Sequence, residues 1–346
     1  MRFLWRWIKR VVLLLLIVVL GLLSPVAYVE TMCRSAVVAD DHASILPPAD
    51  RRPEARTLLT YPEWHIVHAY ADYAEVIRTG DPDDFGYLRS VGGFWSSLCA
   101  LSGAAGAQGG VDWPTKQMVY TIGVSFTAEL LLKAAYEETL GRLATLIRGP
   151  VRSPLDDLSA TQAADYATFL QQVPWYRWDF RRDADALRAA RTDSFRDRER
   201  AIALGLEDRA KAAYAGVIGA AVAGMAPDAL TMRSIVTGRT PEALAGIKGV
   251  MVTGQRPEGI EIETPRYRAF TDLAKVMAAQ AVSFVEIAGN DDILLTVISD
   301  TAFLQGALHS FARQGNPGYR HLVLIKVGKL AQTLNSGAEI EHIHDY

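Results

Sequence analysis

Cysteine is scarce in this sequence of 346 residues, which contains only two. Two cysteines are too few for a scaffold built on disulfides or for a zinc site with four cysteine ligands. Basic and acidic residues nearly balance, 36 against 39, so the formal net charge is −3. The chain therefore lacks the excess of positive charge that is typical of dedicated nucleic-acid binders, and we expect no nucleic-acid partner.

Recognisable catalytic motifs are missing as well. No glycine-rich loop ends in Gly-Lys-Ser/Thr, and the glycines of residues 103–110 do not form a dinucleotide-binding fingerprint. Residues 123–127 lack the second glycine of a hydrolase nucleophile elbow. The sequence names no cofactor, and it favours a protein that acts by binding over an enzyme.

A long apolar run near the start is the strongest signal that is present. Residues 11–29 carry no charge, whereas residues 1–10 contain four basic side chains and no acid. A helix of this length spans about 28 Å, close to the hydrocarbon thickness of a bilayer, and Trp5 and Trp7 lie where interfacial aromatic residues are common. We expect a single-pass signal-anchor in a bacterial-type inner (plasma) membrane, with residues 1–10 in the cytoplasm and the bulk of the chain periplasmic or extracytoplasmic.

Two alternatives exist for this run. A cleaved signal peptide has the same basic start and apolar core, but Pro25 stands where a cleavage site after Ala27 requires a small residue. A buried helix of a soluble protein rarely has so many branched apolar residues without a polar stripe.

The exported part is predicted to contain a proline-bearing linker at residues 30–56 and a mainly helical domain at residues 57–240. Within the domain we expect helices at 60–78 and 85–100, a flexible loop at 102–110, a core helix at 115–147 and a long solvated helix at 177–211. The last interpretation rests on ten basic and eight acidic side chains with few large apolar residues.

Two segments of this domain have a membrane-spanning alternative. Residues 119–132 are apolar, but Glu129 interrupts them, and a central carboxylate is costly in lipid. Residues 212–227 carry Gly216, Ala220 and Gly224 on one helical face, which permits close helix packing. We favour a soluble core helix for the first segment and a tightly packed soluble helix for the second.

Residues 241–346 are predicted to form an α+β domain. The pattern predicts strands at 248–253 and 259–263, a helix from Thr264 to about Gln280, a hairpin over 282–298, a helix at 302–314 and strands at 321–327 and 338–344. The expected class of the whole chain is α+β, with a C-terminal ferredoxin-like α/β sandwich and no internal repeat in the sequence.

Two histidine pairs are the candidate metal ligands. His65 and His68 are three residues apart on an expected helix, and His342 and His344 point the same way on an expected strand. Two imidazoles can share a metal, and one can ligate a haem iron. The alternatives are core histidines with hydrogen bonds for the first pair and a solvated chain end for the second, and nothing in the sequence brings the pairs together.

Aromatic side chains and the two cysteines leave further questions open. Four aromatic residues lie within 175–180, and we favour packing against the core or a partner over a membrane surface or a flat ligand. Trp64, Trp175 and Trp178 are candidate walls of a haem or metal site. An oxidising compartment permits a disulfide between Cys33 and Cys99, but the sequence does not decide it.

These observations lead to two functional hypotheses. The first is a membrane-anchored envelope protein that acts by binding, as an accessory or scaffold subunit of an inner-membrane or periplasmic complex, with the lipid bilayer and a protein as its partners. The alternative is a metal- or haem-handling envelope protein, conceivably an enzyme, that uses the pair His65 and His68.

Overall fold

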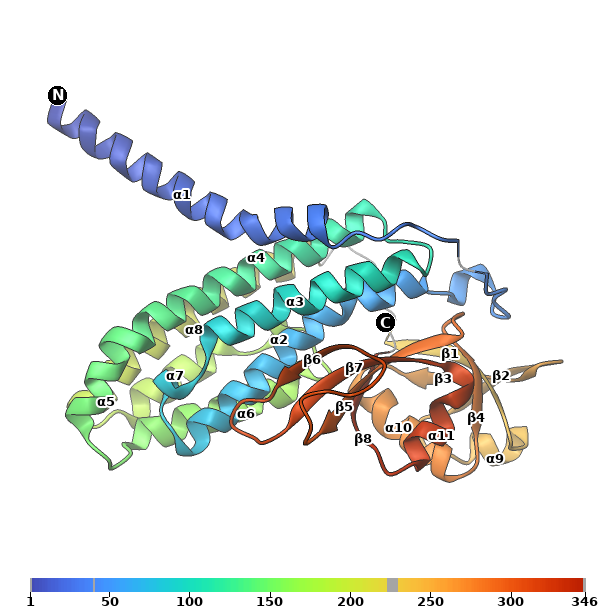
Figure 1. The fold of residues 1–346 in the computed structure, drawn as a ribbon. Coiled ribbons are helices and arrows are strands. Elements are labelled where there is room, and N and C mark those ends of the chain that lie inside the picture. Colours follow the sequence, from blue (N-terminus) through green and yellow to red (C-terminus); the bar gives the residue numbers. More distant parts are fainter. Residues whose placement is uncertain (1, 40, 223–229, 345–346) are drawn as a thin grey trace.

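The computed structural model describes residues 2–39, 41–222 and 230–344. Figure 1 shows a long N-terminal helix that projects from a bundle of helices, and two antiparallel sheets of four strands each beside that bundle. The expected α+β class is confirmed, with an apolar N-terminal helix, a helical middle portion and a mixed C-terminal portion.

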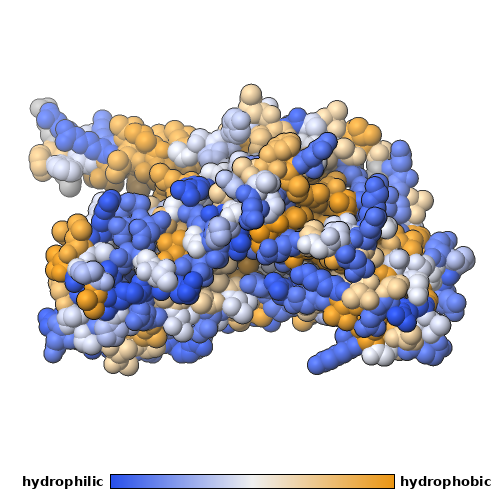
Figure 2. All heavy atoms as spheres, turned by 60° about the horizontal axis from the view of Figure 1, so that its bottom comes forward, coloured by the Kyte–Doolittle hydropathy of each residue, from blue (hydrophilic) through white to orange (hydrophobic). Residues whose placement is uncertain are grey.

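Helix α1 (Arg2–Met32) contains the apolar run, and its side chains are exposed over most of its length. In Figure 2 it forms an orange projection with a blue end, because the basic residues precede the apolar ones. Only its final turns pack against the protein, and Val29 is buried there. By length and composition, α1 and the region 113–148 are the two helical stretches among the described residues that qualify as candidate membrane spans.

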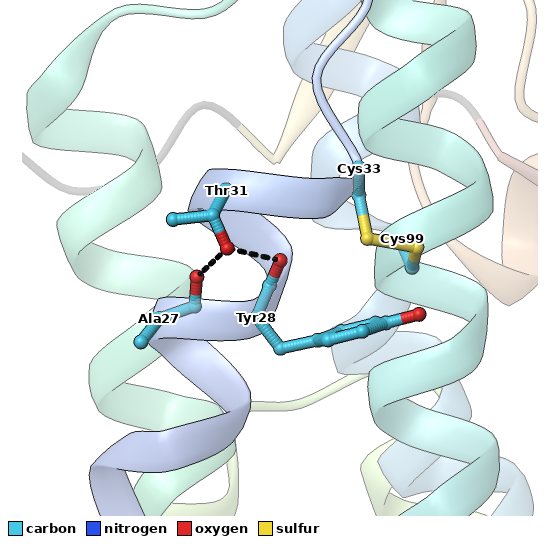
Figure 3. The surroundings of a disulfide bond; sticks show 5 residues. All are labelled: Ala27, Tyr28, Thr31, Cys33 and Cys99. Atoms are coloured by element: carbon cyan, nitrogen blue, oxygen red, sulfur yellow. Dashed lines mark hydrogen bonds between the residues drawn. A yellow bond between two sulfur atoms is a disulfide. The ribbon is translucent and has the colours of Figure 1, made fainter.

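The two cysteines form a disulfide, which the sequence had left undecided. Figure 3 shows Cys33 at the end of α1 joined to Cys99 of α3, which lies 66 positions further along the sequence. Near this end Glu30 pairs with Lys116, the two side chains being 3.2 Å apart, and accepts a hydrogen bond from Tyr120. The end of α1 is therefore held to the bundle by a covalent bond and by polar contacts.

The bundle packs its helices around a core of aromatic and aliphatic side chains. Ser153 and Asp156 form a capping box that starts α6, and Asp179 caps α7. The bounds of the helices are α2 (Glu54–Thr79), α3 (Tyr87–Gly106), α4 (Trp113–Tyr136), α5 (Arg142–Arg148), α6 (Pro154–Leu170), α7 (Phe180–Ala190) and α8 (Phe195–Val222).

Three expectations for this bundle need correction. The expected loop at 102–110 is wrong in its first half, because α3 continues to Gly106. The expected helix at 115–147 is interrupted by a π-helical turn, Glu137–Gly141, and only one of its sides is buried. In α8, a Cβ on Gly216 would meet nothing within 4 Å, so the expected tight packing at this residue is wrong; Gly224 lies outside the described residues.

The expected long solvated helix at 177–211 is also wrong. Two separate helices, α7 and α8, cover this range. The side chains of Arg196 and Arg200 are almost fully buried. Arg196 pairs with Asp156 of α6, and Arg200 pairs with Glu137 of the π-helical turn. Some of the charges in this range are therefore buried in ion pairs between elements, which composition alone does not distinguish from a solvated surface, whereas others, such as Arg181 and Arg188, are exposed.

The two sheets repeat one strand order. The first has the order β2-β3-β1-β4 and the second the order β6-β7-β5-β8, with antiparallel neighbours throughout. Numbered from its own first strand, each sheet reads 2-3-1-4. The sequence shows no repeat, so the repetition is evident only in the topology. The bounds are β1 (Thr231–Thr237), α9 (Pro241–Ala245), β2 (Met251–Arg256), β3 (Gly259–Pro265), α10 (Arg268–Ala279), β4 (Ser283–Ile287), β5 (Asp292–Ser299), β6 (Ala307–Ala312), β7 (Tyr319–Lys326), α11 (Leu330–Asn335) and β8 (Glu339–His344).

This topology overturns two local expectations and shifts one boundary. The hairpin expected over 282–298 is wrong, because β4 belongs to the first sheet and β5 to the second; the turn between them is a crossover. The helix expected at 302–314 is wrong, because the segment contains β6, whose pairing with β7 overrides its local helix preference. Strand β1 begins at Thr231, within the range expected to be mainly helical.

Two interfaces place the sheets. The sheets share one hydrophobic core, which includes Ile262 of the first and Leu295 of the second. A separate cluster joins the second sheet to α2 and α3 through Leu58, Leu101 and Leu322. The second sheet therefore lies between the first sheet and the helical bundle, and its contact with α2 contains the histidines that the sequence singled out.

The segment expected as a linker also packs against the sheets. Glu286 of β4 is fully buried, and it accepts hydrogen bonds from the backbone N–H groups of Ile45 and Leu46. The His42 side chain lies 3.1 Å from the same carboxylate. Residues 42–46 are therefore held in place on β4.

Candidate functional site

One face of α2 carries polar side chains into the contact with the second sheet. Tyr61, His65, His68 and Asp72 are three or four residues apart, so they lie on one side of the helix. None of them is more than 5% exposed. From the sheet they meet the side chains of Arg320, His342 and His344, which are equally buried.

Three of the four candidate histidines surround the indole of Trp64. The ring of His342 stacks on it with centroids 3.4 Å apart, and the rings of His344 and His68 lie 5.8 and 6.1 Å from it. The structure therefore brings His68 of α2 and the two histidines of β8 together. The sequence named these residues individually but gave no sign of their proximity.

His65 points in a different direction, toward α3 and β6. Its Nε2 atom donates a hydrogen bond to the carbonyl oxygen of Ser90 at 2.9 Å, and its ring lies 5.1 Å from that of Phe311. His65 and His68 are thus neighbours on the helix surface, but they serve different contacts.

Each histidine beside Trp64 has one nitrogen close to a polar partner and one without a partner. His342 Nδ1 is 3.0 Å from the Thr271 hydroxyl, and His344 Nε2 is 2.8 Å from the Thr296 hydroxyl. His68 Nδ1 lies 3.5 Å from a carboxylate oxygen of Glu341. The other nitrogen of each ring is buried without a hydrogen bond. Such atoms in a native protein require an explanation, for example a bound water or ion.

Burial keeps these imidazoles uncharged. Loss of hydration lowers the pKa of His65 to about 4 and that of His344 to about 3. Burial, followed by the Arg320 cation, also places the pKa of His68 well below its usual value. Neutral imidazole is the form that ligates metals. Within residues 2–39, 41–222 and 230–344, however, no group of three or more His, Cys, Asp or Glu side chains is placed to hold a metal ion, and the metal site at His65, His68, His342 and His344 stays a prediction.

Arg320 of β7 links the bundle to the second sheet. Its Nη1 atom donates to Asp72 of α2 at 2.8 Å, and its Nε atom donates to Glu341 of β8 at 2.6 Å. Asp72 also accepts a hydrogen bond from the backbone N–H of Gln314 at 3.0 Å. Because the buried guanidinium group binds a carboxylate of α2 and a carboxylate of β8 at the same time, this network joins α2 to the sheet.

A cavity of about 70 Å³ lies within the bundle. It combines aromatic walls with charged groups, which is common where small ligands bind. The sequence had named Trp178 as a candidate wall but none of the charged residues, because they come from separate helices. The aromatic residues are Tyr70, Tyr73, Tyr166, Trp178 and Phe180, and the charged residues are Lys133, Asp183, Glu207, Asp208 and Lys211.

Most charged groups of this cavity are paired. Lys211 Nζ lies 2.7 Å from Glu129 and 2.9 Å from Glu207, and it sits above the ring of Tyr70. Burial and the neighbouring carboxylate of Glu207 raise the pKa of Asp208 to about 7. Asp208 therefore exchanges a proton near neutral pH, which makes the cavity a second candidate site.

The comparisons give no relative from which a role can be transferred. Neither a family model, a curated protein nor a solved structure matches the chain.

Proposed function

We propose that the protein is a membrane-anchored envelope protein that acts by binding, as an accessory or scaffold subunit of an inner-membrane or periplasmic complex. In this proposal α1 crosses the inner (plasma) membrane once, its basic end lies in the cytoplasm, and the bundle and sheets lie on the periplasmic side. The observation that carries the proposal is the disulfide between Cys33, at the end of the exposed apolar helix, and Cys99 of the bundle.

The disulfide supports export because such bonds persist in oxidising compartments and are rare in the cytosol. The docked end of α1 supports an anchor that is retained. Val29 is buried, and Glu30 contacts Lys116 and Tyr120, so the last turns of α1 belong to the folded protein. A helix held in this way also keeps the bundle close to the membrane, where its effective concentration for membrane partners is high.

The contacts that join the parts of the exported portion support a scaffold role. The two sheets share a core, and the Arg320 network joins the second sheet to α2. We further propose that both sheets are ferredoxin-like units. The first follows the element order β-α-β-β-α-β of that fold, and the second has the same strand order but no helix between its first two strands.

Topology reporters test this proposal directly. A phosphatase that is active only outside the cytoplasm, fused after residue 346, should be active, and a cytosolic fluorescent protein at the same place should be dark. The Cys33→Ser/Cys99→Ser variant should lose the mobility difference between reduced and non-reduced gels. A fluorescent cytosolic fusion, or a mature chain that begins after residue 29, would contradict the anchor.

Purification tests the mode of action. The full-length protein, extracted from gently solubilised membranes, should co-purify with a stoichiometric partner, whereas a partner-free monomer would contradict a scaffold role.

The unpartnered nitrogens around Trp64 favour a metal- or haem-handling role as the second candidate. His68, His342 and His344 each have one neutral nitrogen that is buried without a hydrogen bond. Metal analysis and an absorption spectrum of the purified full-length protein test this role. Stoichiometric metal or pigment that is lost in His68→Ala and His342→Ala supports it, and a colourless, metal-free protein contradicts it.

A further inference from the structure

An exposed apolar surface covers one flank of the bundle. It consists of the outward side chains of residues 113–147, which form α4, the π-helical turn and most of α5, and of α8; we call it the α4–α8 face. Large aliphatic side chains on it are between 54 and 74% exposed, the main ones being Leu132, Leu140, Leu143, Ile202, Leu206 and Val217. Monomeric soluble proteins rarely expose a contiguous patch of this kind unless something binds to it.

The face is continuous because α4 and α8 are in direct contact. Lys133 of α4 pairs with Glu207 of α8, and the hydroxyl of Tyr136 donates to Glu199. These polar side chains point between the helices, whereas the aliphatic ones point outward. The two helices therefore present apolar residues to the same surroundings, while their charged residues are used internally.

The few exposed charges on this face are mainly positive. Among the exposed residues of 113–147 and 195–220, the charged ones are Glu138, Arg142, Arg198 and Arg209. They sum to +3 − 1 = +2, in a chain whose net charge is −3. Two of the arginines also have an acidic neighbour, since Arg142 lies 3.6 Å from Asp83 and Arg198 lies 3.4 Å from Asp193. An apolar surface with arginines at its edge is complementary to acyl chains next to lipid phosphates.

The position of α1 indicates what the α4–α8 face contacts. Lys116 and Tyr120, in the first turns of α4, contact Glu30, and the disulfide holds the same end of α1 to α3. Figure 1 shows that α4 begins beside the end of α1 and runs away from it along the bundle, with α5 at its far end. The apolar surface of α1 and the α4–α8 face therefore begin next to each other.

We propose that the α4–α8 face lies on the outer leaflet of the bilayer that α1 crosses, with its aliphatic side chains among the upper acyl chains and its arginines at the phosphates. This inference rests on the proposed anchoring by α1. Residues 113–148 do not cross the bilayer themselves, because one side of α4 packs against the bundle core through Val119, Phe126 and Leu130. The surface instead fixes the exported part flat against the membrane.

Fluorescent labels in reconstituted full-length protein test the contact. Single cysteines at Leu143 and Leu206 are labelled with an environment-sensitive dye under non-reducing conditions, in vesicles of phosphatidylcholine and phosphatidylglycerol. Met251→Cys is the matched control, because Met251 of β2 is apolar and 55% exposed, against 54% for Leu143. A label at Leu15, in the middle of the apolar run of α1, reports on the anchor itself.

The expected result is a blue-shifted emission and a several-fold stronger quenching by brominated lipid at Leu143 and Leu206 than at Met251. If Leu15 is quenched but Leu143 and Leu206 behave like Met251, the lipid contact is wrong and the anchor stands. If Leu15 is not quenched either, the anchor fails as well. A blue shift without lipid quenching, which grows with the protein-to-lipid ratio, would show contact between copies and would also overturn the proposal.

Discussion

His65 and His344 are residues whose ionisation is tied to folding. Their imidazoles are buried, and burial lowers their pKa to about 4 and about 3. In the unfolded chain both titrate near pH 6.5. Between these values the unfolded state binds protons that the folded state does not, so their stabilising effect is complete above pH 6.5 and is lost as the pH falls.

We predict that His65→Gln makes stability less sensitive to acid. The amide keeps a donor for the Ser90 carbonyl but cannot be protonated in this range. The wild type should lose up to about 3 kcal/mol more than the variant between pH 7 and pH 4. Urea unfolding in detergent at several pH values measures this difference. His309→Gln is the control, because its imidazole is only partly buried and should change the slope less. Equal slopes for the wild type and His65→Gln would contradict the prediction.

Asp208 should have the opposite pH dependence. Burial and the adjacent Glu207 raise its pKa to about 7, against an ordinary value of 3.8, so the folded state binds the proton more tightly than the unfolded state. Its contribution to stability is greatest at low pH and is lost as the pH rises toward 7. We predict that Asp208→Asn is more stable than the wild type at pH 8 and that this gain shrinks at pH 5.

Thermal unfolding at the two pH values measures the Asp208 effect. Asp193→Asn is the matched control, because the Asp193 side chain is fully exposed and should show no gain at pH 8. A gain that is the same at both pH values would mean that packing, not ionisation, is responsible.

The sequence identified only some of the residues that form the candidate sites. The sequence drew attention to the histidines and to Trp178 because such residues are chemically versatile. It did not indicate that Asp208 titrates near neutral pH, because the cause is burial beside Glu207 within a cavity that several helices build.

At the level of single elements, two adjacent glycines of α3 have opposite roles. A Cβ on Gly93 would lie 2.6 Å from the imidazole of His65, whereas a Cβ on Gly92 would meet nothing within 4 Å. His65 cannot easily move away, because it is buried and bonded to Ser90. Gly93 therefore permits α2 and α3 to approach each other, and Gly92 only lowers the helix preference of its position.

We predict opposite effects for the two alanine substitutions. Gly93→Ala should destabilise the protein by about 1–3 kcal/mol through overpacking. Gly92→Ala should stabilise it by about 0.5–1 kcal/mol, because alanine favours the helix. Chemical denaturation of the two variants under one condition checks both signs. If Gly93→Ala is as stable as Gly92→Ala, the contact between α2 and α3 at His65 is looser than described.

Elements that depend on local patterns were predicted correctly, whereas segments that depend on contacts between distant residues were not. Helix α10 and strand β3 were predicted from local patterns, and the apolar face of α10, including Phe270 and Met277, is buried as expected. The errors at 177–211 and 282–298 have a different origin. In the first range the chain forms two helices, and Arg196 and Arg200 are buried in ion pairs with other elements. In the second range the chain crosses from one sheet to the other. Neither feature leaves a local pattern.

At the scale of the whole molecule, the contact between α2 and the second sheet joins parts that are far apart in the sequence. Asp72 and Glu341 meet only because each binds Arg320. The same contact brings His68 to Trp64, His342 and His344. The sequence predicted that a helical part precedes an α+β part, but it could not predict this contact, because no periodicity relates residues more than 200 positions apart.

We predict that Arg320→Ala destabilises the protein by about 3–5 kcal/mol. The substitution leaves the buried Asp72 and the partly exposed Glu341 without their cation, which costs more than the loss of an exposed pair. Arg256→Ala is the matched control. Arg256 is partly exposed and pairs with Glu261 within the first sheet, so we expect a cost of no more than about 1 kcal/mol.

Hydrogen exchange decides whether the Arg320 effect is located at the contact. If Arg320 joins the bundle to the second sheet, Arg320→Ala should speed exchange in α2 and β8 before it affects the first sheet, because the two sheets keep their shared core. Uniformly faster exchange would show that the network stabilises the whole protein rather than this contact. Unchanged exchange in α2 would show that the apolar cluster of Leu58, Leu101 and Leu322 is sufficient to hold the two parts together.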